Sequence, residues 1–552
     1  MTRRMLILGL DGATLDVIAP LAAAGELPTL ATMIERGASG TLRAPMPPVT
    51  PPSWASFYTA VNPGKHGIFE FSHRERDSYR YVPINSTFLR RPTFWKLLSD
   101  QGARVGVVNT PLIYPPQPIN GVVVSGFMTP PGAKSPSYPE GFMDELLAAV
   151  PGYASWPPEL QLGHGNEASY VRTAAELIDA QFDAMEYALR WLDQWDLFFG
   201  AVQFPDQIFH WFWKYDDPGH PLHSAADPAF KGTVRQIHRH LDQRIGRIRE
   251  LAGPDVLTMV LSDHGNGPLV RDLYVDTLLA ERGWTSFKRS PLTLGKRGLR
   301  RLGFTPSMGF RVGHSVGLGG FVRRAMRFRR SVLDKAIATA YISPDDIDWP
   351  RTQATAYGTW GNVYMNVAGR EPQGSIRAEA YESTRAAIIE DLSSVIDPDS
   401  SEPIFSEVLS RDDVYTGQEL NGAPDILLVP RDDTVHPVAL LPFAEKQWIS
   451  PPFSVESGWH RRDGLLLIDG PGVRAGSTTS GARIEDAGAT VLAYMGAGLS
   501  EDLDGNPLTE WFRPGELHGS PTSSLLTPVA PVQPYSSEEQ ALIDKRLSEL
   551  GY

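Results

Sequence analysis

Short runs of apolar residues, most of them ended by an acidic or polar residue, recur along the chain. Such continuous runs are typical of strands that are buried on both faces, as in a parallel sheet. They predict strands at residues 5–10, 104–109, 121–125, 196–204, 256–261, 354–368, 423–429 and 464–468.

Between these runs, apolar residues recur at helical spacing. They predict helices at residues 14–36, with a break near Gly25 and Pro28, and at 92–101, 167–194, 228–252, 376–395, 485–497 and 537–550. Residues 127–165 are rich in Pro and Gly and predict a surface excursion. The alternation of buried strands and helices predicts an α/β fold with a largely parallel central sheet.

One segment departs from both patterns. Five prolines crowd residues 45–52, so we expect residues 45–54 to form a rigid loop that is neither helix nor strand, followed by a helix to about Val61. The segment carries two hydroxyls, Thr50 and Ser53, just before an apolar run. One interpretation is a stiff turn with Ser53 as a helix N-cap. The other is a nucleophile held at a loop-to-helix junction, where free N–H groups favour an anionic substrate.

Composition narrows the function. With 552 residues the chain is too long for one simple domain, and 42% hydrophobic residues are ordinary for a globular protein. The net charge of −13 argues against general nucleic-acid binding. The absence of cysteine excludes disulfides, thiolate metal sites and a catalytic thiol. The first apolar run is too short for a signal peptide or membrane span, so we expect a cytoplasmic protein.

Residues 286–330 are locally basic, with twelve Lys or Arg and no acid. We keep two interpretations: a solvated insert, or an arm that binds an anionic substrate or a membrane surface. The chain then divides into a discontinuous core at 1–285 and 346–500, a basic insertion or cap at 286–345, and a tail at 501–552 that packs on the core.

Acidic and histidine residues gather near the predicted strands. Most of them close a strand or follow it, as Asp11, Asp206, Asp263 and His264 do, with His210 four residues after Asp206; His460 lies just before the strand at 464–468, after a glycine turn. Ligands at one edge of a parallel sheet meet in space however far apart they are in sequence. Any one of these residues alone is more simply a cap or a structural histidine, but the set of six points to a shared site.

This donor set suits a pair of divalent metal ions. Asp206 and His210 are four residues apart, so one helical turn would direct both at a single ion. Three carboxylates and three imidazoles suit Zn²⁺ and, less well, Mn²⁺. Two such ions can clamp the attacking and leaving oxygens of phosphoryl transfer, and one of them can activate a threonine hydroxyl.

The chain resembles the alkaline phosphatase superfamily and, within it, the type I phosphodiesterase/nucleotide pyrophosphatase family. The resemblance covers most of residues 5–285 and 350–500. Its markers are Leu10-Asp11-Gly12, Thr50-Pro51-Pro52-Ser53, Pro63 with His66-Gly67-Ile68, Pro205-Asp206 with His210, Ser262-Asp263-His264-Gly265, and Gly458-Trp459-His460.

The resemblance implies a three-layer α/β/α sandwich that hydrolyses phosphate diesters or nucleotides at two zinc ions through a phospho-threonine intermediate. Thr50 would be the nucleophile. One zinc ion would be held by Asp11, Thr50, Asp263 and His264, and the other by Asp206, His210 and His460. Ser53 stands where many relatives have an Asn that contacts a phosphate oxygen, which puts that contact in doubt.

Several alternatives stay open. A phosphomonoesterase or a phosphonate hydrolase would use the same nucleophile and metals, and an inactive metal-binding relative would act through its basic insert. A sulfatase is disfavoured because Thr50 cannot supply the required formylglycine. The aromatic residues Trp211, Phe212 and Trp213 would either stack on a substrate or pack in the core.

Overall fold

The computed structural model describes residues 3–75, 77–156, 166–309, 341–452, 456–518, 521–522 and 531–550. Its centre is a nine-stranded sheet in which seven strands run in one direction and β19 and β7 run in the other. Across the sheet the order is β20 (Ser477–Arg483), β2 (Ala38–Arg43), β19 (Asp463–Asp469), β9 (Leu257–Leu261), β1 (Met5–Leu10), β8 (Leu197–Val202), β5 (Val105–Thr110), β6 (Gly121–Ser125) and β7 (Ser137–Tyr138).

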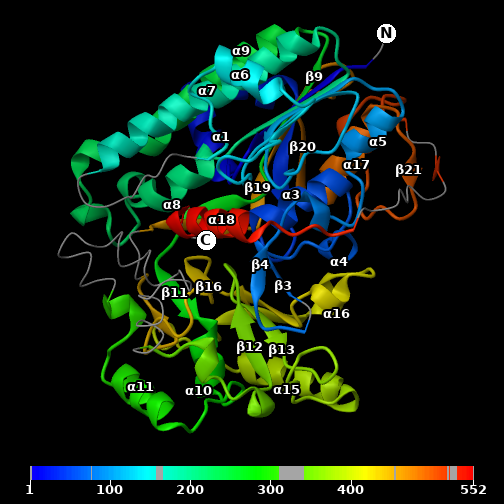
Figure 1. Cartoon of the computed structure of the whole chain (residues 1–552). Coiled ribbons are helices and arrows are strands. Elements are labelled where there is room, and N and C mark those ends of the chain that lie inside the picture. Colours follow the sequence, from blue (N-terminus) through cyan, green and yellow to red (C-terminus); the bar gives the residue numbers. More distant parts are fainter. Residues whose placement is uncertain are drawn as a thin grey trace.

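Helices cover both faces of this sheet, because the buried strands alternate their side chains between two apolar clusters. In β1, Leu6 and Leu8 face one cluster and Ile7 faces the other. The first cluster packs under α1 (Leu15–Ala23), α2 (Pro28–Arg36), α6 (Phe142–Ala149), α7 (Glu167–Leu192), α8 (Phe204–Asp216) and α9 (Thr233–Ala252). The second packs under α3 (Thr50–Thr59), α5 (Phe94–Asp100) and α17 (Ile484–Tyr494) (Figure 1). The predicted three-layer α/β/α sandwich is confirmed.

A smaller lobe lies below the main sheet in Figure 1 and has its own apolar cluster. Its sheets are formed by β12 (Ala354–Tyr357), β13 (Asn362–Met365), β15 (Ile426–Pro430) and β14 (Phe405–Ser410), and by β16 (Val435–Val438), β11 (Arg271–Tyr274) and β17 (Ile449–Ser450). Its helices are α10 (Val275–Glu281), α11 (Pro291–Arg301), α15 (Tyr381–Ser393) and α16 (Arg411–Val414).

Short elements join these two parts. They are α4 (Pro63–His66), the hairpin of β3 (Ser72–Arg74) and β4 (Tyr81–Pro83), the ribbon of β10 (Gly265–Pro268) and β18 (Gly458–Arg461), and α18 (Ser537–Leu550). A further pair, β21 (Leu499–Ser500) and β22 (Pro521–Thr522), lies beside α17 on the main sandwich (Figure 1). In α18, Ile543 and Leu547 belong to an apolar cluster that also contains Val82 of β4.

Several predictions about local structure are wrong, and two of them concern whole segments. Residues 50–54 are not loop: α3 begins at Thr50 and includes both Pro51 and Pro52. Proline is tolerated in a first helical turn because the N–H that it lacks has no partner inside the helix there. Residues 127–165 are not a plain excursion either, since β7 and α6 lie within them; residues 157–165 fall outside the described part of the chain.

The division into core, insertion and tail stays a prediction. The basic stretch at 286–330 is described only as far as residue 309, so its remainder and residues 331–340 lie outside the described residues. Among the described residues no single helix is long and apolar enough to cross a membrane; only the bent pair α1 and α2, taken together, passes a test of length and composition.

Candidate functional site

Three adjacent parallel strands deliver acidic side chains to one edge of the main sheet. β1 pairs with β8 on one side and with β9 on the other, and the Asp11 N–H donates to Val202 O at 3.0 Å. The chain leaves these strands at Asp11, at the start of α8, and at Ser262-Asp263-His264. The strand ends therefore meet at one edge, as the sequence predicted.

A fourth element, the strand β18, brings His460 to the same edge. This strand pairs antiparallel with β10, so that His460 is opposite Asn266. β10 begins directly after His264, and this ribbon therefore brings His460 back over the strand ends. The expected glycine turn before His460 is wrong: Gly458 itself belongs to the strand.

Thr50 and Ser53 lie on the first turn of α3. Val49 is the N-cap, and no side chain caps the helix, so the interpretation of Ser53 as the N-cap is wrong. The Ser53 N–H instead donates to Val49 O at 3.1 Å. Positions three residues apart share a helix face, so the two hydroxyls are neighbours on α3. Ser53 Oγ is buried and has no hydrogen-bond partner among the described residues.

One group of side chains surrounds His264. Its Nε2 atom lies 3.3 Å from Thr50 Oγ1, 3.5 Å from Asp11 Oδ1 and 3.4 Å from Asp263 Oδ2. All four residues are buried. A hydroxyl oxygen, two carboxylates and one imidazole nitrogen thus converge on a small volume.

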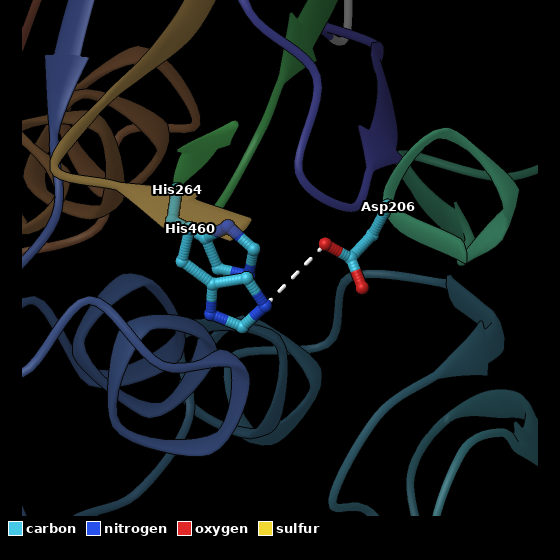
Figure 2. Close-up of side chains that lie close together, drawn as sticks. All are labelled: Asp206, His264 and His460. Carbon is cyan, nitrogen blue, oxygen red and sulfur yellow. Dashed lines mark ion pairs between the residues drawn. The ribbon is translucent and has the colours of Figure 1, made fainter. Parts of the chain in front are cut away.

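A second group surrounds Asp206. Its Oδ2 atom lies 3.1 Å from His210 Nε2, one turn along α8, and its Oδ1 atom lies 3.4 Å from His460 Nε2. The two imidazole Nε2 atoms are 3.3 Å apart. Figure 2 shows Asp206 facing His460, with His264 beside that ring; the two rings stack at 3.8 Å between centroids.

The two groups form one cluster. Asp11, Asp263 and His264 offer ligand atoms within 4.8 Å of one another, and so do Asp206, His264 and His460. His264 belongs to both sets, although the family resemblance places it with one ion only. The described residues thus contain two adjoining groups that could hold a metal ion.

Each histidine is held in the same orientation by the backbone. The Nδ1 atoms of His210, His264 and His460 lie 3.0 Å from Gly458 O, Gly265 O and Pro48 O respectively. A carbonyl oxygen only accepts, so each Nδ1 is the donor and carries the proton. The Nε2 atom of each ring then faces the cluster, which is how metal-binding imidazoles are normally oriented.

Burial and mutual repulsion shift the pKa values of the acids in the first group. Burial, joined by the neighbouring carboxylates, raises the pKa of Asp11 and of Asp263 well above their usual range. Burial, joined by the neighbouring imidazoles of His460 and His210, lowers the pKa of His264 well below its ordinary value, so that ring is neutral. A divalent cation would favour ionised carboxylates and neutral imidazoles, which is the donor form a metal requires.

Asp206 behaves differently from the other two acids. Burial acts to raise its pKa, but the facing imidazoles of His210 and His460 outweigh burial and hold that pKa well below its usual range. Asp206 is therefore the fixed negative charge of the second group.

Two buried carboxylate oxygens test whether the cluster fits a cation. Asp11 Oδ1 and Asp263 Oδ2 accept no hydrogen bond from the residues that the structure describes. Buried polar atoms in native proteins nearly always have partners, and a bound ion is one explanation for an oxygen without one. Both oxygens face His264 Nε2, and the residues present therefore fit a bound cation.

Sequence reasoning missed Asn266. Its Nδ2 donates to Asp206 Oδ1 at 2.9 Å and to Gly12 O at 3.1 Å, while the Gly12 N–H donates to Asp263 Oδ1 at 3.1 Å. Gly12 has φ +68°, and a Cβ there would lie 2.8 Å from Asp206 Cβ. Asn266 stands two residues after His264, but only the pairing of β10 with β18 reveals its position.

The aromatic residues after His210 belong mainly to the core. Trp211 and Phe212 are buried in the apolar cluster beneath α8, and Trp213 packs against it. Phe212 stacks on Tyr170 at 5.9 Å between centroids. The core-packing interpretation of these residues therefore accounts for their contacts.

A cavity of about 740 Å³ lies elsewhere, between the β3–β4 hairpin, the smaller lobe and α18. Its walls include two stacked aromatic pairs, Tyr79 with Trp349 and Tyr81 with Tyr357. None of the predicted site residues is among the described residues that line it. We therefore assign the chemistry to the buried cluster.

An α/β/α sandwich that gathers carboxylates, imidazoles and a hydroxyl at its strand ends has the donor set of a metal-dependent enzyme. This chain belongs to the type I phosphodiesterase / nucleotide pyrophosphatase family, whose model matches residues 5–437. It is therefore a hydrolase acting on phosphoric esters. The matched range contains every predicted ligand except His460, which the fold alone brings to the site.

Solved structures give more distant similarities. Phosphonoacetate hydrolase from Sinorhizobium meliloti in complex with phosphonoformate is 16% identical, with a TM-score of 0.49, covering 88% of this chain and 94% of that one. Murine ectonucleotide pyrophosphatase / phosphodiesterase 5 is 12% identical, with a TM-score of 0.46, covering 93% and 100%. No curated protein sequence matches this chain.

Proposed function

We propose that this protein is a two-zinc phosphodiesterase of the nucleotide pyrophosphatase type, with Thr50 as its nucleophile. The observation that carries the proposal is the convergence of three inward-facing Nε2 atoms and three buried carboxylates beside the Thr50 hydroxyl. The substrate class is a small phosphate diester or nucleotide.

Seven residues would hold the two ions. Asp11, Asp263, His264 and Thr50 would ligate one, and Asp206, His210 and His460 the other, with His264 near enough to serve either. A mixed set of oxygen and nitrogen donors without thiolate favours Zn²⁺, and Mn²⁺ is the alternative. Bound cations would supply Lewis acidity to the phosphate and lower the pKa of the Thr50 hydroxyl.

The protein's own residues then act in two steps. Thr50 gives up its hydroxyl proton, its Oγ1 attacks phosphorus, and the bond from phosphorus to the leaving oxygen breaks. The leaving alcohol takes up a proton and departs, and Thr50 is left esterified to the remaining phosphate monoester. Water attacks this ester, the Thr50 oxygen departs and regains a proton, and free phosphate monoester leaves. Burial of the cluster keeps bulk water from competing with the first step.

Ser53 is the group we assign to a phosphate oxygen. Pro51 and Pro52 carry no N–H, so the first turn of α3 offers fewer backbone donors than a usual helix start. The buried Ser53 hydroxyl lies on the same helix face as Thr50 and has no partner among the described residues, so it can donate to a bound phosphate.

The test is a comparison of Thr50→Ala with Thr59→Ala, a matched change at the other end of α3, where Thr59 Oγ1 donates only to Ala55 O. Thr50→Ala should reduce turnover of bis-p-nitrophenyl phosphate by about 1,000-fold or more while two metal ions per chain remain bound. Thr59→Ala should keep turnover within a few-fold. Undiminished turnover by Thr50→Ala would remove Thr50 as the nucleophile.

A substrate panel separates the alternatives that share this site. Metal-loaded protein is assayed with bis-p-nitrophenyl phosphate, p-nitrophenyl phosphate and phosphonoacetate, and the highest kcat/KM identifies a diesterase, a monoesterase or a phosphonate hydrolase. We expect the diester to be preferred. Bound metal with no turnover of any member would favour the inactive metal-binding relative.

A further inference from the structure

The surface helix α11 buries polar side chains and exposes apolar ones, which is the reverse of the usual arrangement. Its buried side chains are Thr293 and Lys296, whereas its leucines point outward. The exposed fractions are 57% for Leu292, 51% for Leu294, 43% for Leu299, 77% for Leu302 and 51% for Phe304 just after the helix. A surface helix normally buries its apolar stripe and exposes its polar one.

Polar contacts fix this orientation. Thr293 Oγ1 and Lys296 Nζ each lie 2.8 Å from a carboxylate oxygen of Asp346. Arg300 donates to Thr277 Oγ1 at 2.9 Å and to Glu445 O at 2.6 Å. The inward face of α11 is therefore anchored by hydrogen bonds and an ion pair, and the leucines are not needed to hold the helix in place.

The outward residues form one apolar patch, which we call the α11 patch: Leu292, Leu294, Leu299, Leu302 and Phe304. Ten large hydrophobic side chains are exposed in the part of the chain that the structure describes, and five of them are in this patch. Such a concentration marks an interaction surface, because single exposed apolar residues are ordinary but grouped ones are not.

Charge indicates what the patch contacts. Lys288, Arg289 and Arg301 are exposed on the segment that carries the patch, although the Lys288 ammonium also donates to Asp345 O at 2.8 Å, and residues 286–330 contain no acid in a chain of net charge −13. Two copies of this basic surface would repel each other. Nucleic acid would require basic side chains on the contact face, which here is leucine. Apolar insertion flanked by Lys and Arg is the pattern of helices that lie in an anionic membrane interface.

We propose that the α11 patch docks this hydrolase on an anionic lipid surface, with the leucines among the acyl chains and Lys288, Arg289 and Arg301 at the phosphate headgroups. In Figure 1, α11 lies at the outer end of the smaller lobe, away from the main sheet. A bilayer could therefore meet the helix without displacing the core that carries the phosphodiesterase site.

The absence of cysteine allows a direct test on the full chain. A Leu302→Cys variant is labelled with the fluorophore NBD and mixed with phosphatidylglycerol-containing vesicles. We expect a blue shift and a several-fold rise in emission, weaker with pure phosphatidylcholine and weaker at high salt. The matched control is Leu222→Cys, at an exposed leucine far along the chain from α11, which should show no change.

Substitutions provide the second measurement. The double variant Leu299→Gln/Leu302→Gln should lower vesicle co-sedimentation by about 10-fold or more, whereas Leu222→Gln should not. Arg289→Gln/Arg301→Gln should weaken binding and its salt dependence. All these variants should keep wild-type turnover of a soluble diester. Unchanged co-sedimentation in both double variants would overturn the proposal, and so would an emission change that depends on protein concentration without vesicles, which would indicate self-association.

Discussion

Gly12 connects the two halves of the candidate centre through its backbone. Its N–H fixes Asp263, and its carbonyl receives the Asn266 amide that also holds Asp206. The left-handed φ and the close approach of Asp206 both require glycine here. At the scale of single residues, the positions of the carboxylates are therefore set by two residues that we do not expect to touch a metal.

Removing the Asn266 amide should weaken metal binding. Asn266→Ala leaves Gly12 O without this donor and frees Asp206 Oδ1, and loss of such supporting contacts typically costs 10- to 100-fold in metal affinity. Competition against a chromophoric zinc chelator measures the change. The control is Asn366→Ala: Asn366 is also buried and donates to three backbone carbonyls, but in the smaller lobe. Equal affinities in the two variants would contradict the positioning role of Asn266.

At the scale of elements, α17 supports the helix that carries Thr50. Gly488 of α17 lets the two helices approach closely, because a Cβ there would meet the Phe57 carbonyl oxygen of α3. The first turn of α17 also buries Glu485, and burial raises the pKa of this carboxyl to about 7. Folding therefore protonates Glu485 at pH values between its unfolded pKa of about 4.5 and 7.

The burial of Glu485 predicts that the stability difference between the wild type and Glu485→Gln depends on pH. The pKa of Glu485 is higher in the folded than in the unfolded protein. Its contribution to the free energy of unfolding is therefore most favourable below about pH 4.5, and it falls by about 3 kcal/mol at most as pH rises to 7. Glu485→Gln should match the wild type near pH 5 and melt about 1–3 °C higher near pH 8. Glu510→Gln, at an exposed position, should have the same melting temperature as the wild type at both pH values. The same midpoint difference for Glu485→Gln at pH 5 and pH 8 would argue against this assignment.

Sequence pattern predicted the central strands that are apolar throughout and missed edge strands that are not. β1, β8 and β9 are continuous apolar runs and were found within two residues at each end. β2 (Ala-Ser-Gly-Thr-Leu-Arg) and β20 (Ser-Thr-Thr-Ser-Gly-Ala-Arg) lack such a run, because they lie toward one edge of the sheet and expose alternate residues. The helix that follows the proline loop was predicted, but its start at Thr50 was not, because a proline in an isolated sequence does not reveal which turn of a helix it occupies.

For the site, residue type and position at strand ends were sufficient to find the acids and histidines that the structure brings together. They were not sufficient for Asn266, Gly458 or Pro48, whose contributions depend on strand register or on backbone carbonyls. A carbonyl that orients an imidazole can belong to any residue type. Such supporting contacts become visible only once the chain is folded.

At the scale of the whole molecule, the cluster places three carboxylates and three imidazoles inside the protein, and metal should therefore stabilise the fold. Binding to the native state contributes about 4 kcal/mol for each ion present at 1,000 times its Kd. Chelation should lower the melting temperature, and added Zn²⁺ should restore it. Asp206→Asn, which keeps the side-chain volume but loses the charge, should show a smaller difference between chelated and zinc-loaded protein. An unchanged melting temperature after metal removal verified by elemental analysis would contradict this expectation.

The route of β18 back to the sheet edge has a consequence during synthesis of the protein. Six of the seven predicted ligands have been translated once His264 is added, but the seventh, His460, follows 196 residues later (460 − 264). At about 5–20 residues per second a ribosome needs roughly 10–40 s to add that stretch. If these seven residues are the ligands, a growing chain would hold a captured cation with an unfinished set and could release it again. The choice of metal would then fall to the completed polypeptide, in equilibrium with the ions around it.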